Sequence, residues 1–111
     1  MTEVVIIRKE GRIVFFSAEG HAGFAEHGED IVCAALSTAL QFPIAHLDQV
    51  LDIVPRYEIS EDGLLKVDFR GVDLKGNDRE LNVLLEMMYL TVKQLAREYS
   101  EFIKLVEKEE K

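Results

Sequence analysis

The first apolar segments of the chain are short and rich in β-branched and aromatic residues, which is typical of β-strands. Residues 3–8 (EVVIIR) and 12–18 (RIVFFSA) are separated by a short polar turn that ends in Gly11. Because glycine readily adopts a positive φ, Gly11 can close a tight turn between two antiparallel strands. We therefore predict a β-hairpin over residues 3–18.

A second pair of segments repeats this arrangement further along the chain. Residues 56–60 (RYEIS) and 64–70 (LLKVDFR) flank a polar turn that ends in Gly63. In the second of these strands, apolar residues alternate with Lys66, Asp68 and Arg70. Such alternation is expected when one face of a sheet is buried and the other contacts water. A second hairpin in the same, mainly antiparallel sheet is predicted.

Each predicted hairpin precedes a segment with helical spacing. The later helix is expected to begin after Asn77, an N-cap residue followed three positions later by Glu80. Behind this cap, apolar residues recur at steps of three and four and form a stripe that should face the core: Leu81, Leu84, Leu85, Met88, Val92, Leu95, Phe102, Ile103 and Val106. Residues 107–111 are expected to be a frayed, solvated end.

The earlier helix is expected to begin near Ile31, and it is apolar on more than one side. Its apolar residues include Val32, Ala34, Ala35, Leu36, Ala39, Leu40, Ile44 and Leu47. Pro43 lies inside this run and should cause a kink or an early stop. One face can pack on the sheet, and the rest must be covered either by the glycine-rich loop and the second helix of the same subunit or by a second subunit. Symmetric pairing is the commonest of these arrangements in soluble proteins. We therefore expect a homodimer whose interface includes this helix or a sheet edge.

Together these elements predict one α+β domain over residues 1–111. The order is ββαββα, and the expected architecture is a two-layer sandwich of a mainly antiparallel sheet and two helices.

Composition narrows the possible partners and compartments. The chain has 111 residues and a formal net charge of −8, so nucleic acid is not expected to be a direct partner. We see no signal peptide and no stretch near the roughly 20 apolar residues that span a bilayer. One cysteine cannot form an intramolecular disulfide, so no oxidising compartment is required. These features predict a cytoplasmic protein.

The least ordinary stretch is residues 20–37, GHAGFAEHGEDIVCAALS, which contains the only cysteine. Asp30 is expected to cap the first helix and to place Cys33 in its first turn. Unpaired backbone N–H groups and the helix dipole favour the thiolate there. His21 could return over this helix start, and a cysteine and a histidine so placed are the parts of a nucleophile and its base.

Other interpretations of these residues remain open. A lone cysteine at the start of an apolar helix is often a small buried hydrophobe. A metal site with His21, His27 and Cys33 would lack the paired spacing of zinc ligands, so no metal or other cofactor is expected. Ser37 lies on the same helix face as Cys33 and can simply bond back to the helix.

Gly20-His21-Ala22, followed by DIVCAALS at residues 30–37, resembles the motifs of the ribosomal-processing cysteine proteases, the Prp family. The resemblance covers essentially the whole chain. It implies that Cys33 is the nucleophile and His21 the catalytic histidine, while Gly20, Asp30 and Ser37 match further motif positions. It also implies an acyl-enzyme mechanism in which the loop carrying Phe24 closes over an extended apolar peptide.

The resemblance further implies a substrate and an assembly state. Enzymes of this family remove a short N-terminal extension from large-subunit ribosomal protein L-twenty-seven, so the expected partner is the precursor of that protein. It also points to a homodimer. Two other functions stay open on the sequence: a non-catalytic ribosome-assembly or binding module with an inert thiol, and a small metal-dependent hydrolase.

Overall fold

The computed structural model describes residues 1–20, 29–60 and 64–111, with only the backbone described at residues 29 and 30. Five strands form one sheet in the order β3-β4-β2-β1-β5. The elements in chain order are β1 (Thr2–Lys9), β2 (Arg12–Glu19), α1 (Glu29–Ala45), α2 (Leu47–Leu51), β3 (Arg56–Ile59), β4 (Leu65–Asp68), α3 (Asp78–Glu98) and β5 (Ile103–Glu110). The predicted α+β fold, with a mostly antiparallel sheet and the order ββαββα, is confirmed, and β5 is added to it.

Both predicted hairpins are present. β1 pairs antiparallel with β2, and the turn between them places Glu10 at φ 53° and Gly11 at φ 80°. Two successive positive φ values are the mark of a type I′ turn, whose twist matches that of the flanking strands. β3 pairs antiparallel with β4, and β4 pairs antiparallel with β2. The sheet is thereby continuous across the two hairpins.

The C-terminal segment differs from its prediction. α3 ends at Glu98, and residues 103–110 form β5, which pairs in parallel with β1 over eight residue pairs. Phe102, Ile103 and Val106 therefore do not continue the helical stripe, and the expected frayed end is a strand. Their spacing also fits a helix, but parallel pairing satisfies the backbone groups of β5 that face β1 and buries Ile103 in the core.

The start of α3 lies where it was predicted, although its cap is different. Asn77 occupies the N-cap position, but its side chain makes no capping hydrogen bond. Instead, Asn77 Nδ2 donates to the carbonyl oxygen of Leu51 at 2.9 Å, which ties the start of α3 to the end of α2. The capping side chain therefore stabilises a contact between helices rather than the helix end itself.

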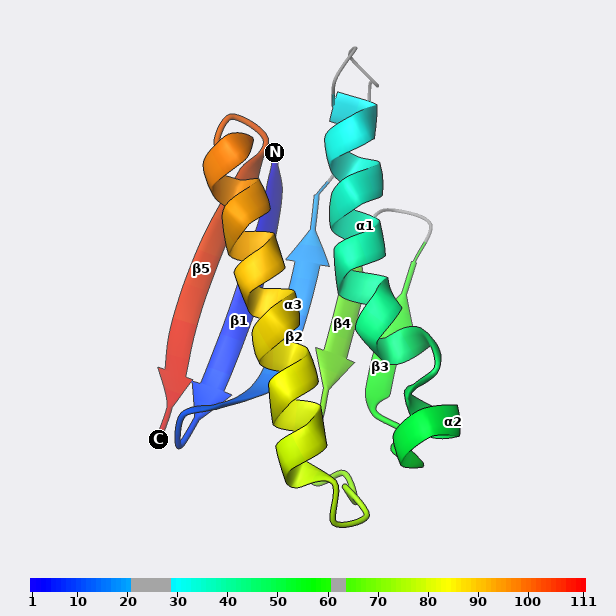
Figure 1. Ribbon diagram of the computed structural model, residues 1–111. Coiled ribbons are helices and arrows are strands. Elements are labelled where there is room, and N and C mark those ends of the chain that lie inside the picture. The colour runs from blue at the N-terminus through cyan, green and yellow to red at the C-terminus, as the bar shows by residue number, and fades with distance from the viewer. Residues whose placement is uncertain (21–28, 61–63) are drawn as a thin grey trace.

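α1 and α3 cover the same face of the sheet, α1 over the β4–β3 side and α3 over the β1–β2 side (Figure 1). α1 continues through Pro43, so the helix does not stop at that residue as one of the two expectations had it, and it ends two residues later at Ala45. The core lies between the two layers. Its most completely buried large side chains are Phe16, Ile6, Leu40, Ile53, Leu85, Val4, Val67 and Val92.

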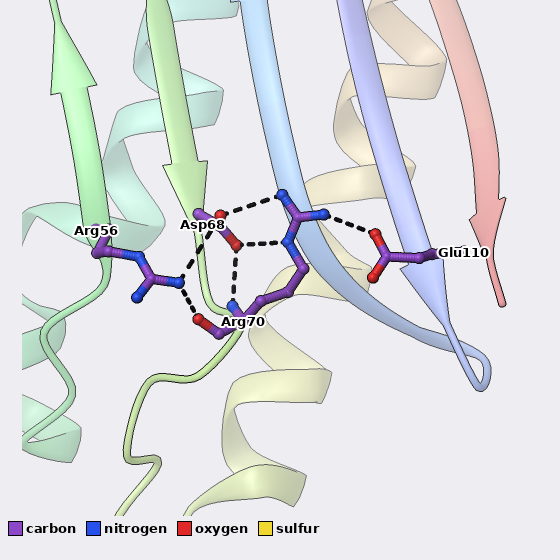
Figure 2. A network of polar contacts seen from close by, with 4 residues as sticks. All are labelled: Arg56, Asp68, Arg70 and Glu110. Carbon is purple, nitrogen blue, oxygen red and sulfur yellow. Dashed lines mark hydrogen bonds and ion pairs between the residues drawn. The ribbon is translucent and has the colours of Figure 1, made fainter.

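An ionic network crosses the other face of the sheet (Figure 2). Arg70 Nε and Nη2 donate to the two carboxylate oxygens of Asp68 at 2.9 and 3.1 Å, and Arg70 Nη1 donates to Glu110 at 2.6 Å. Arg56 donates to the carbonyl oxygen of Arg70. These hydrogen bonds from Arg70 lower the pKa of the Asp68 carboxyl, and the two carboxylates raise the pKa of Arg70. The network links β3, the end of β4 and β5.

The outward surface of the helical layer carries several exposed apolar side chains. Phe42, Val50, Met87 and Leu90 each expose 60% or more of their surface. Residues 31–51 are long and apolar enough to cross a membrane by length and composition alone, so the expectation that no such stretch exists is wrong. Here the stretch is divided into α1 and α2, and Val32, Leu36, Leu40 and Leu47 belong to the core.

Candidate active site

Cys33 lines a cavity of about 190 Å³ between the N-terminal half of α1 and the sheet. The sheet side comes from four strands: the start of β1, the end of β2, and the ends of β3 and β4 at their hairpin. The complete lining is Thr2, Ala18, Gly20, Cys33, Leu36, Ser37, Leu40, Gln41, Ile59, Ser60, Leu64 and Leu65. Cys33 is half-buried and has a free thiol. A partly exposed thiol in such a cavity can reach a bound ligand, which a fully buried cysteine cannot do.

The position of Cys33 on α1 differs slightly from its prediction. α1 begins at Glu29, so Asp30 lies inside the first turn and not at the N-cap, and Cys33 is the fifth helical residue. The unpaired N–H groups of a helix belong to its first turn, so those next to Cys33 come from the residues just before it. Cys33 therefore begins the second turn of α1, beyond the first turn in which the helix dipole acts most strongly.

Gly20 also lines the cavity, just after the end of β2, and its position requires glycine. Its φ is +96°, and a Cβ atom built there would lie 2.7 Å from the carbonyl oxygen of Met1. In addition, Thr2 Oγ1 donates to the carbonyl oxygen of Gly20 at 3.0 Å. The backbone is therefore fixed at the residue immediately before His21.

Ser37 lines the same cavity one helical turn after Cys33, and its side chain is exposed. The structure thus brings together three of the predicted site residues, Gly20, Cys33 and Ser37. His21 and Phe24 lie outside the described residues, as does His27. Only the backbone of Asp30 is described. Within residues 1–20, 29–60 and 64–111, no group of three or more potential metal ligands is found.

Several lining residues were not identified from the sequence. Ile59, Ser60 and Leu64 approach Cys33 only because the β3–β4 hairpin lies beneath α1. Ser60 N donates to the carbonyl oxygen of Leu64 at 2.9 Å and fixes the end of the hairpin at the cavity. The only signal in the sequence is the pair of apolar residues beside the second turn, which is equally typical of an ordinary hairpin.

The chain resembles known proteins over nearly all of its sequence. The sequence model of the family described as Cysteine protease Prp matches residues 1–104. The chain is 28% identical over 105 residues to the ribosomal processing cysteine protease Prp of Staphylococcus aureus strain Mu50, covering 95% of this chain and 96% of that protein. It is 27% identical over 108 residues to the protein of the same name from Bacillus subtilis strain 168, with the same coverage.

Solved structures have the same fold. The Streptococcus mutans protein SMU.848 superposes with a TM-score of 0.85 at 28% identity, covering 99% of this chain and 96% of that one. The S. aureus processing protease Prp, solved in complex with a substrate peptide, superposes with a TM-score of 0.81 at 25% identity, covering 96% and 99%. Both the sequence and the fold therefore match over nearly the full chain.

Proposed function

Because the chain belongs to the Prp family of cysteine proteases, we propose that it removes the N-terminal extension of the precursor of ribosomal protein L-twenty-seven. The observation that carries the proposal is the cavity that Cys33 shares with Gly20, the residue directly before His21. The curated relatives are ribosomal processing proteases, and one structural relative was solved with a substrate peptide. A peptide from a ribosomal precursor is thus the proposed substrate.

In the mechanism we propose, Cys33 and His21 carry out acyl transfer. His21 accepts the thiol proton, and the thiolate sulfur attacks the scissile carbonyl to form a tetrahedral intermediate. Its collapse breaks the C–N bond, and His21 returns the proton to the leaving amine. Water, deprotonated by His21, then attacks the thioester and releases the acid and the free thiol. Backbone N–H groups at the start of α1 are the proposed donors to the oxyanion.

The remaining motif residues take supporting roles in this proposal. Gly20 leaves the backbone before His21 in a conformation that a side chain would prevent. Ser37 lies at the mouth of the cavity, where a hydroxyl can bond to a peptide backbone. Asp30 and Phe24 are proposed to support the histidine and the peptide, respectively. Cleavage of a newly made ribosomal protein would take place in the cytoplasm, which is the proposed location.

The direct test is incubation with the precursor of L-twenty-seven from the same organism, followed by intact-mass measurement of the products. We expect two products whose masses sum to that of the precursor plus one water. A precursor lacking the extension is the control and should stay intact. An unchanged precursor after incubation with active, folded protein would contradict the proposed substrate.

We also propose that the protein is a homodimer, with the exposed apolar surface of the helical layer in its interface. Phe42, Val50, Met87 and Leu90 each expose 60% or more of their apolar side chains on the helical layer, and a self-complementary interface would bury them. Sedimentation of the wild type at micromolar concentration should give about twice the 12.6 kDa of the chain. Phe42→Glu should shift it toward the monomer, whereas a persistent 12.6 kDa wild-type species would exclude the dimer.

A further inference from the structure

A second and larger cavity adjoins the one that contains Cys33. It has a volume of about 340 Å³ and lies between the C-terminal half of α1, α2 and β3. The two cavities share Gln41 and Ile59, so together they form a groove along α1. Figure 1 shows β3 at the edge of the sheet beside this helix. The part of the groove farther from the thiol is lined by residues that have no role in the proposed acyl transfer.

Among residues 1–20, 29–60 and 64–111, the wall formed by β3 has backbone groups with no hydrogen-bond partner. Ser60 N donates to Leu64, so the hydrogen-bonded pairs of this antiparallel hairpin are 60/64, 58/66 and 56/68. The alternate residues, Tyr57 and Ile59, must then direct their N–H and C=O groups away from β4. β3 is an edge strand of the sheet, so these groups lie at its free edge. They are available to pair with an added strand.

The side chains of the same two residues point into the groove. Tyr57 and Ile59 lie opposite Val67 and Leu65, which face the helical layer. Tyr57 is nonetheless 61% exposed, Ile59 51% and the neighbouring Val54 65%. Apolar side chains around a cavity beside free backbone groups are what a strand-adding peptide requires: hydrogen bonds for affinity and a pocket for an alternate side chain.

We infer that this second cavity, which we call the distal pocket, binds an apolar side chain of the substrate peptide several residues from the cleaved bond. The peptide would lie extended in the groove and pair with the free edge of β3. This inference rests on the proposed function, since it places the reacting carbonyl at Cys33. It assigns Val54 and Tyr57 as determinants of specificity.

The geometry sets the distance along the peptide. Cys33 and Gln41 are eight residues apart on α1, which corresponds to about 12 Å, and Ile44 lies about 16 Å away at 1.5 Å per residue. An extended peptide covers these distances in about four to five residues at about 3.3 Å each. The distal pocket should therefore receive the side chain roughly four to six residues from the scissile bond.

The test uses nested synthetic peptides that span the bond cleaved in the precursor, with six residues on each side in the longest. They are shortened one residue at a time from either end. With wild-type enzyme, kcat/KM should fall about tenfold or more when the residue in the distal pocket is removed from one end. The end that shows this loss identifies the direction of binding. A smooth dependence on length at both ends would overturn the inference.

Variants can distinguish loss of the distal pocket from a general loss of folding or of catalysis. Tyr57→Ala and Val54→Glu should lower kcat/KM for the longest peptide about tenfold, mainly through KM, and should not affect peptides too short to reach the pocket. Glu58→Ala is the matched control, because Glu58 is exposed on the same strand with its side chain on the other face. Equal cleavage of the long peptide by wild type and by both pocket variants would overturn the inference. Val54 lies outside any strand, so Val54→Glu can be used to test the pocket if the Tyr57→Ala protein does not fold.

A binding measurement keeps this test independent of catalysis. Fluorescence anisotropy of the labelled longest peptide with Cys33→Ala should give a Kd that rises about tenfold when Tyr57→Ala is added. Binding with no dependence on Tyr57 would contradict the distal pocket. Absence of cleavage by wild type, with binding that still depends on Tyr57, would instead contradict the proposed protease substrate and leave the pocket supported.

Discussion

The two edges of the sheet differ in length, pairing and exposure. β5 pairs with β1 over eight residues, whereas β3 has four residues, all of them exposed. Near the β5 edge, Arg8 makes paired hydrogen bonds to Glu86 of α3 at 2.5 and 2.8 Å, and Arg70 reaches Glu110. Both cavities of the proposed peptide groove lie on the β3 side. The β5 edge therefore stabilises the fold through a long strand pairing and ionic contacts, while the β3 edge presents exposed apolar side chains beside the two cavities.

This difference predicts that changes at the two edges affect different measurements. Changes around β5 and α3 should lower stability, with little effect on the turnover of molecules that remain folded. Changes near α1 and β3 should lower turnover or substrate binding, with little effect on stability.

The largest effect is expected at Cys33. Cys33→Ala and Cys33→Ser should abolish cleavage, because neither side chain can supply the thiolate nucleophile. Removal of the half-buried sulfur should cost only about 1–2 kcal/mol of stability. Cleavage is measured by intact mass and stability by urea unfolding. Undiminished turnover by Cys33→Ala would contradict both the nucleophile and the protease mechanism.

The next effect is expected at His21. His21→Ala should lower kcat at least about a hundredfold, the usual contribution of a general base, and remove the limb of the pH–rate profile that belongs to the imidazole. His27→Ala is the matched control and should keep that limb. If His21→Ala is as active as wild type at pH 7 while His27→Ala is not, the base has been assigned to the wrong histidine.

A core substitution should lower stability and leave turnover almost unchanged, the reverse of the changes at Cys33 and His21. Leu85 of α3 is 1% exposed, so Leu85→Ala should lower the free energy of unfolding by about 3 kcal/mol through lost burial and a residual cavity. Turnover per folded molecule should remain within about twofold of wild type. Arg79→Ala, at an exposed position on the same helix and outside the proposed dimer interface, should change stability little in comparison. A large fall in kcat at unchanged stability would show that the two edges are coupled.

A smaller, pH-dependent effect is expected at Asp68. Its folded-state pKa lies below its unfolded-state value near 4, so its contribution to stability is present above that pH. The contribution is lost as the pH falls through the folded-state pKa. Asp68→Asn should cost about 1 kcal/mol at pH 7 and reduce the loss of stability on acidification below pH 4. Equal slopes for the variant and wild type between pH 4 and 2 would exclude this linkage.

No effect is expected from metal removal. A thiolate nucleophile needs no Lewis acid, so cleavage should be unchanged after treatment with EDTA. Activity before and after treatment, with zinc added back, provides the measurement. Loss on treatment followed by recovery with zinc would favour a metal-dependent hydrolase over the proposed mechanism.

The sequence predicted the local elements better than the long-range ones. Both hairpins and the start of α3 follow from turn residues and periodicity, which act within a few residues. β5 was missed because Phe102, Ile103 and Val106 also fit helical spacing, and its charged residues are poor local strand formers. Its strand conformation depends on β1, about a hundred residues earlier in the chain, which no local pattern reports.

The candidate site shows the same division between residues that are close in sequence and residues brought together by the fold. Gly20, Cys33 and Ser37 lie within one segment of sequence, and the fold brings them to one cavity. Ile59, Ser60 and Leu64 were missed because they reach that cavity only through the packing of a hairpin beneath α1. Motif residues are thus readable from local sequence, while the surface that would select a substrate depends on tertiary structure.

The contact between Gly20 and the first residues of the chain matters for how the protein is purified. Met1 approaches Gly20 too closely for a side chain there, and Thr2 both bonds to Gly20 and lines the Cys33 cavity. The C-terminus lies at the opposite end of the sheet (Figure 1). An affinity tag fused to Met1 would therefore begin at the rim of the cavity and compete with peptide for that space, whereas a tag after Lys111 would extend away from it.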